Sequence, residues 1–284
     1  MSLAFEKAQS GDTITLLTNI TLDARLTFPS DKDLTLDLNE KIVTINNEFI
    51  LINDSTSTVI VSIINGTIKH TGVGVNAPAI YANKAKKVEV RDVMIDCVSN
   101  LGILANLTGT IDVSKCSITA KVYAISNSCV GTTKITNCNI STVTCGIYTS
   151  DKTNGEITIS DCTITGGRYG IIDKTKGTTT ISNCTISNVT DAGINKTSST
   201  STTTISGCTI SGPTSVTINS AVDASQVEEF KLNALAKIND IREYRKKISV
   251  LGLDGENIIQ AITEFQNALN YIRNRQTCWS LKSA

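Results

Sequence analysis

The hydrophobic positions of this chain repeat about every 23 residues, and isoleucine holds two of them. The first slot contains Ile42, Ile68, Ile95, Ile118, Ile140, Ile164, Ile186 and Ile210. The second slot, usually written GI or AI, contains Ile80, Ile103, Ile125, Ile147, Ile171, Ile194 and Ile218. A repeat of this length predicts one supersecondary unit stacked on copies of itself.

Inside each repeat, hydrophobic and polar residues alternate with a period of two. Residues 156–165 show this best, with one extra residue, Asp161, at a bend. Strict alternation predicts short β-strands, and Asn or Asp at the bend favours a turn. Two to three strands per repeat without a helix predict an all-β solenoid, a single-stranded parallel β-helix over residues 12–221.

Five of the nine cysteines occupy one slot in successive repeats: Cys116, Cys138, Cys162, Cys184 and Cys208. Neighbouring strands lie about 4.8 Å apart, so these side chains should form an interior column. Free cysteine behaves there as a small hydrophobic residue. Zinc sites usually need CxxC pairs, and the sequence has none. We therefore expect structural thiols, with no metal site and no cofactor.

The two ends of the chain depart from the repeat. Residues 1–11 contain Leu3, Phe5 and Ala8, which could cover the first coil as an amphipathic cap. Residues 222–284 predict an α-helical hairpin, because two apolar stripes recur there at helical spacing. The stripes are Val227, Phe230, Ala234, Ile238 and Ile241, then Ile258, Ile262, Phe265, Leu269 and Ile272. The hairpin is interpreted as a cap on the last coil, an oligomerisation or docking module, or both.

The repeated segments of the ISNCTIS type and the GI strands resemble the pectate-lyase-like family of right-handed β-helices over roughly residues 12–220. The opening segments LAFEKAQSGDTITLL and LTLDLNEKIVTI are similar to the start of such solenoids. The resemblance implies a right-handed coil. Many members cleave polysaccharides, whereas others are parts of phage fibres, spikes and decoration proteins.

The balance of charges argues against two classes of partner and indicates no other. The chain has 26 basic and 26 acidic residues, so neither a nucleic-acid nor a membrane partner is expected. The opening MSLAFEKAQSGD lacks the pattern of a secretory signal. With reduced thiols, this predicts folding in a bacterial cytoplasm. After release, the protein is expected in a virion or extracellular particle.

Candidate chemistry is sparse. An outward column should contain Glu89, Asp112, Lys134, Thr158, Thr180 and Thr204. If the chain is an enzyme, Glu89 and Asp112 would be its carboxylates with Arg91 beside them; surface charge is the alternative interpretation. The sole histidine, His70, is predicted to lie exposed in a glycine-rich loop. Candidate ligand-binding rings lie near the GI strands: Tyr81, Tyr123, Tyr148 and Tyr169.

These patterns leave several functions open. The first is a non-enzymatic structural or adhesive component of a phage or phage-derived particle. It would be a homo-oligomer that joins other virion subunits through the C-terminal helices. The second is a module that binds a cell-surface or capsule glycan, and the third is a polysaccharide-degrading enzyme. Outward threonine columns also occur in ice-binding proteins, although threonine is common on any exposed strand.

Overall fold

The computed structural model describes residues 1–46, 49–52, 58–72, 77–97, 100–197, 201–212 and 216–218. The chain divides into two compact units, Met1–Ala221 and Val222–Ala284. The second unit, and with it the predicted helical hairpin, lies outside the described residues. No helix among the described residues is long and apolar enough to cross a membrane.

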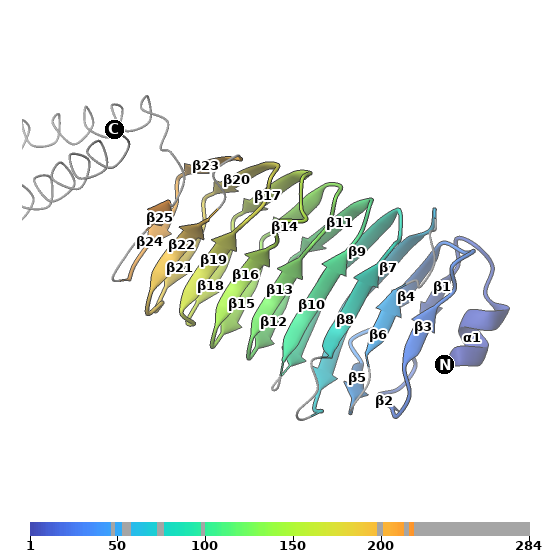
Figure 1. Ribbon diagram of the computed structural model, residues 1–284. Helices are drawn as coiled ribbons and strands as arrows, with labels where there is room; N and C mark the ends of the chain where they lie inside the picture. Colours follow the sequence, from blue (N-terminus) through green and yellow to red (C-terminus); the bar gives the residue numbers. More distant parts are fainter. Residues whose placement is uncertain are drawn as a thin grey trace, which may run out of the picture. The chain divides into compact units, whose positions relative to one another are not determined.

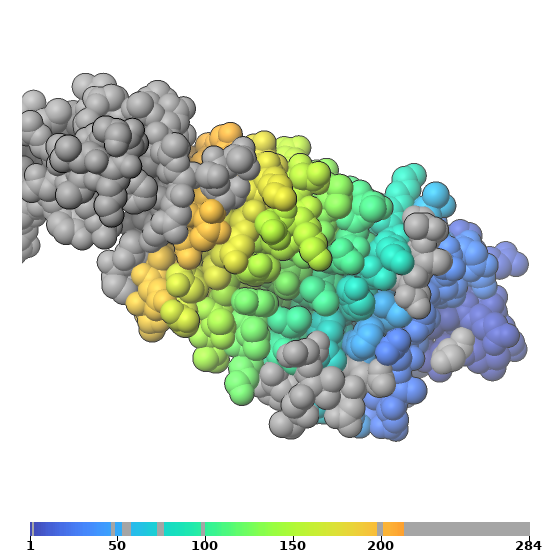
Figure 2. Space-filling model, viewed as in Figure 1, coloured from blue at the N-terminus to red at the C-terminus, as the bar shows by residue number. Residues whose placement is uncertain are grey.

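The first unit is a right-handed parallel β-solenoid of about eight turns. Its strands form one 16-stranded and one 9-stranded parallel sheet. The larger sheet bends along its length into two faces, so each turn presents three faces to solvent. Successive turns follow one another from the blue to the orange end in Figure 1, and as adjacent bands of colour in Figure 2.

The strands of each face are in register from turn to turn. Face 1 consists of β1 (Thr13–Thr15), β4 (Leu34–Asp37), the first part of β7 (Ile60–His70) and of β9 (Lys87–Cys97), β11 (Thr110–Ser114), β14 (Thr133–Thr136), β17 (Glu156–Ser160), β20 (Thr178–Ser182) and β23 (Thr202–Ser206). Face 2 consists of β2 (Ile20–Leu22), β5 (Ile42–Ile45), the second part of β7 and β9, β12 (Ser117–Ala120), β15 (Asn139–Thr142), β18 (Thr163–Thr165), β21 (Thr185–Ser187) and β24 (Thr209–Ile210). Face 3, the 9-stranded sheet, consists of β3 (Leu26–Phe28), β6 (Ile50–Ile52), β8 (Pro78–Asn83), β10 (Leu101–Asn106), β13 (Tyr123–Asn127), β16 (Cys145–Thr149), β19 (Tyr169–Asp173), β22 (Ala192–Lys196) and β25 (Val216–Ile218).

The bend between faces 1 and 2 is made by single residues in the left-handed region. Asn137, Asp161 and Asn183 have φ of 54°, 55° and 52°, as their place in the repeat predicted. Asn and Asp tolerate this conformation because their side chains bond the local backbone. Each such residue turns the strand through the corner, so the next residues can pair on face 2.

The isoleucine slots are interior columns, with one correction at each end. Ile68 and the later members of the first slot stack in register. Ile68 pairs with Val43, however, and Ile42 pairs with outward Thr67. In the second slot, Ile194 pairs with Val216, and Ile218 pairs with Lys196. The predicted places of Ile42 and Ile218 were wrong because the spacing of the repeat changes in the first and last turns.

The glycine of the GI motif is required by packing. A Cβ on Gly146 would lie 2.6 Å from Ile164 Cγ2 and 2.7 Å from the Gly170 carbonyl oxygen. A Cβ on Gly170 would lie 2.4 Å from Ile186 Cγ2. The corner between faces 2 and 3 therefore brings the backbone so close to the core that it has no room for a side chain.

The N-terminus forms a short helix, α1 (Ser2–Lys7). Phe5 is 2% exposed, and its ring lies 4.7 Å from that of Phe28 in β3. Leu3, which was predicted to lie over the first coil, is instead 60% exposed, so only part of the amphipathic face meets the core. The role of residues 1–11 as a cap stays a prediction.

Candidate functional site

The predicted acidic pair lies on face 1. Glu89 and Asp112 are partners on adjacent turns, and the column continues to Lys134, Thr158, Thr180 and Thr204. Glu89 contacts two cations of its own strand, Lys87 Nζ at 3.5 Å and Arg91 Nε at 3.3 Å. Arg91 also contacts Asp92 Oδ2 through Nη1 at 2.6 Å. The Glu89 carboxylate thus belongs to a surface charge network.

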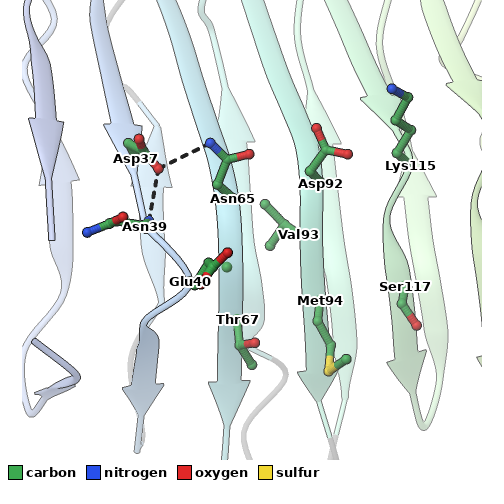
Figure 3. Close-up of a pocket in the computed structure, with 11 residues that line it drawn as sticks. Asp37, Asn39, Glu40, Asn65, Thr67, Asp92, Val93, Met94, Lys115 and Ser117 are labelled. Carbon is green, nitrogen blue, oxygen red and sulfur yellow. Dashed lines mark hydrogen bonds between the residues drawn. The ribbon is translucent and has the colours of Figure 1, made fainter.

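A polar groove that the sequence did not indicate follows the bend between faces 1 and 2 (Figure 3). It has a volume of about 750 Å³ and crosses four turns. Asp37, Asn65, Asp92 and Lys115 follow one another along it, one from each of four successive turns. Asp37 Oδ1 accepts hydrogen bonds from the Asn39 amide at 2.9 Å and from Asn65 Nδ2 at 3.3 Å. The described residues contain no group of three His, Cys, Asp or Glu side chains placed to hold a metal ion.

The four candidate tyrosines all lie on face 3, away from the acidic pair. Tyr81 and Tyr148 occupy one outward column, and Tyr123 and Tyr169 start their strands in a neighbouring column. The rings of Tyr123 and Tyr148 stack, with centroids 5.0 Å apart and planes at 17°. Lys174 Nζ lies 5.5 Å from the centre of the Tyr148 ring. Two of the four rings are therefore brought together, and both are half-buried.

The outer surface of face 3 is more apolar than that of faces 1 and 2. The column that contains Tyr81 and Tyr148 also contains Leu51, Leu104, Ser126, Ile172 and Asn195. At its side, Arg168 lies over the Tyr169 ring at 5.5 Å and bonds Asp191 Oδ2 at 2.7 Å. The pair lowers the pKa of Asp191, mainly through the hydrogen bond from Arg168.

The thiol column is interior over most of its length. Cys116, Cys138, Cys162 and Cys184 are at most 2% exposed, and the eight described cysteines are all free thiols. Each thiol in the column donates to the carbonyl oxygen two residues earlier, as Cys138 Sγ does to Thr136 O at 3.3 Å. The neighbouring Cys116 thiol, together with burial, raises the pKa of Cys138 to about 12. The thiols of the column thus donate to backbone oxygens at the bend.

His70 is not an exposed loop residue. It is 1% exposed at the end of β7, where it pairs in register with Cys97. The prediction was wrong because β7 runs on through the bend at Asn65, so the segment after Asn65 is strand. The glycines that follow His70 in the sequence gave the false impression of a longer loop.

A buried polar corner was missed by the sequence interpretation. The last inward positions of successive face 3 strands are Asn127, Thr149, Asp173 and Lys196, in register. Asp173 is fully buried, and its Oδ1 accepts from Thr149 Oγ1 at 3.0 Å. Lys196 is 3% exposed, and burial lowers its pKa although Asp173 opposes that shift. The signal in the sequence was the polar residue two positions after Ile125, Ile147, Ile171 and Ile194.

Comparison with known proteins agrees with this architecture. Residues 123–229 match a family model described as a right handed beta helix region. The fold is a right-handed parallel β-helix. Neither the curated proteins nor the solved structures contain a match to the chain. The β-helix is thus established by the strand register and the family model, and the function has to be argued from its surfaces.

Proposed function

We propose that this β-helix is a non-enzymatic structural or adhesive component of a phage or phage-derived particle. The observation that supports the proposal most strongly is the state of Glu89. Its carboxylate contacts Lys87 and Arg91 from its own strand, which suits a solvated charge network better than acid–base chemistry. The interior is filled along the turns, so the first unit can act as a stiff rod on the order of 40 Å long at the strand spacing of a sheet.

The particle assignment rests on the analogy of the fold with phage fibres, spikes and decoration proteins. Residues 1–11 would shield the first turn, because an open strand edge invites aggregation. Residues 222–284 would form the helical hairpin that joins the rod to its own copies and to other subunits. As part of the same proposal, we assign the coil to the pectate-lyase-like type of right-handed β-helix.

Sedimentation with particles tests this proposal. The full chain should co-sediment with virions and form a defined oligomer in solution. A chain that lacks residues 222–284 should lose both properties while its β-sheet circular dichroism persists. A monomeric full chain that stays in the supernatant would contradict the proposed role.

The enzyme alternative has its own measurement. Incubation of the full chain with acidic and neutral polysaccharides should release neither reducing ends nor unsaturated sugars. If products form and Glu89→Gln abolishes them, Glu89 is catalytic and the structural proposal fails. Thr158→Ala, in the same outward column, is the matched control for a change on face 1.

Glycan binding is a second candidate, and the tyrosine pair on face 3 favours it. Half-buried rings beside Lys174 offer an apolar surface with a cation, which suits a sugar that carries a carboxylate. Glycan-array binding should fall at least tenfold in Tyr148→Ala. Tyr81→Ala changes a ring that lies 6.0 Å from Phe49, away from the pair, and should bind normally. Equal loss in both variants, or no binding by the unchanged protein, would exclude the Tyr123–Tyr148 site.

A further inference from the structure

Exposure changes along the thiol column. Its first four members are buried, whereas Cys208 is the one cysteine among the eight described that is partly exposed. Cys208 lies between β23 and β24, in a turn where Ile205 and Ile210 are also only partly buried. A reagent in solution can therefore reach this end of the column and not its middle.

Cys184 and Cys208 occupy equivalent places on adjacent turns. The residues on both sides of them are paired, with Ser182 opposite Ser206 and Thr185 opposite Thr209. Neighbouring strands are about 4.8 Å apart, which falls inside the Cα separation of about 4.4 to 6.8 Å that a disulfide spans. Burial, and to a smaller extent the neighbouring Cys184 thiol, raises the pKa of Cys208.

The backbone does not depend on the two thiol donors. Cys208 Sγ donates to Ser206 O at 3.4 Å, and Cys184 Sγ donates to Ser182 O at 3.2 Å. Ser206 O also accepts from the Asn183 amide at 3.0 Å, and Ser182 O from the Asp161 amide at 3.0 Å. Since each carbonyl keeps an amide donor, loss of the thiol protons leaves no unsatisfied buried oxygen there.

We propose that Cys184 and Cys208 form an oxidisable dithiol site that takes a small disulfide such as oxidised glutathione as its co-substrate. The Cys208 thiolate attacks one sulfur of the oxidant, forms a mixed disulfide and releases one glutathione thiolate. Cys184 Sγ then attacks the Cys208 sulfur, and its proton passes to the departing glutathione sulfur, which leaves as a thiol. The protein disulfide forms, and the second glutathione leaves. The protein is oxidised by two electrons, and one molecule of oxidised glutathione is reduced to two thiols.

The disulfide would tie the last described turn to the turn before it. The closed segment runs from residue 184 to residue 208, so the bond restricts the unfolded chain as well as the fraying of this end. The two cysteines would stay reduced in a reducing compartment and form the disulfide in an oxidising one. This inference does not depend on the proposed structural role, since any β-helix with this end exposed would gain the same crosslink.

The test uses the full chain with Cys278, which lies outside the described residues, changed to Ser. Incubation with excess oxidised glutathione should remove two hydrogens from the intact mass. Peptide mapping should link Cys184 to Cys208, and the midpoint of thermal unfolding should rise. Because the surroundings raise the pKa of Cys208, mainly through burial, the rate should increase with pH. Cys208→Ser should prevent the disulfide. Cys116→Ser, at the buried end of the column, should leave the Cys184–Cys208 disulfide able to form.

Peptide mapping of the protein that keeps all five thiols of the column tests for the Cys184–Cys208 bond even if the Cys208→Ser variant fails to fold. Unchanged thiols after prolonged incubation of the folded protein would overturn the proposal. So would a stable glutathione adduct at Cys208 that Cys184 does not displace, or a crosslink that maps to another pair.

Discussion

Lys196 lies on the turn directly after Asp173, and its Nζ is 3.9 Å from Asp173 Oδ2 inside the solenoid. Thr203 Oγ1 donates to the same carboxylate oxygen at 2.7 Å. A buried pair of this kind adds little stability compared with apolar residues, but removal of one partner leaves an uncompensated charge. At this corner of the core, the stability of the fold therefore depends on each charge having its partner.

Asp173→Leu is expected to lower the free energy of unfolding by about 3 kcal/mol, because it leaves the buried Lys196 ammonium without its anion. The double variant Asp173→Leu with Lys196→Met should lose less than the sum of the single changes. Urea denaturation measures all three values. Lys176→Met, on an exposed lysine of the same corner, should stay within about 0.5 kcal/mol of the unchanged protein. Additive losses would show that the two charges are not coupled.

The stability that depends on Lys196 should rise with pH. Burial lowers the Lys196 pKa in the folded state, whereas the unfolded chain keeps the value of 10.5. Between the two values the unfolded state binds more protons, so the free energy of unfolding increases with pH in that window. The free energy of unfolding of the unchanged protein minus that of Lys196→Met, measured from neutral pH up to 10.5, should therefore increase. A decrease would mean that folding raises the Lys196 pKa.

Substitutions at Cys162 test the interior thiol column. Cys162→Asp should lower the free energy of unfolding by more than about 3 kcal/mol, because it buries a carboxylate between two thiols without a cation. Cys162→Ala should lose only about 1 kcal/mol through a small cavity. Cys162→Ser should lie between them, since a hydroxyl can still donate to Ser160 O. Equal stabilities for the aspartate and alanine variants would place the side chain in water.

Gly170→Ala tests the close approach at the corner of faces 2 and 3. The new methyl group would meet Ile186 Cγ2 at 2.4 Å and the Gly193 carbonyl oxygen at 2.6 Å. Overpacking of this kind costs about 1 to 3 kcal/mol. Ile172→Ala, on the half-buried outer side of the same strand, is the control and should cost less. If thermal unfolding shows that Gly170→Ala is as stable as the unchanged protein, the corner is wider than described.

Much of the coil could be predicted because the repeat itself encodes register. Each strand residue is followed one repeat later by its partner on the next turn, so the outward column from Glu89 to Thr204 could be counted out in advance. The method failed at Ile42 and Ile218, where the number of residues per turn changes. It failed at His70 because glycines after a strand do not tell where the strand ends.

The sites were harder to predict than the coil. The stack of Tyr123 on Tyr148 joins two different repeat positions on adjacent turns, so no single column contains it. Asp173 and Lys196 lie two residues after the inward Ile171 and Ile194, so alternation places them inside, but charged residues are seldom buried and these two were passed over. The groove along the bend is lined by residues from four different turns, such as Asp37, Asp92 and Lys115, so no single segment of the sequence indicates it.

The most direct test of the central claim is the sulfur anomalous density of a crystal grown under reducing conditions. The account predicts a line of peaks about 4.8 Å apart for Cys116, Cys138, Cys162, Cys184 and Cys208. Each peak should lie on the interior side of the bend between faces 1 and 2. Sulfurs joined in pairs about 2 Å apart, or scattered over the surface, would contradict it.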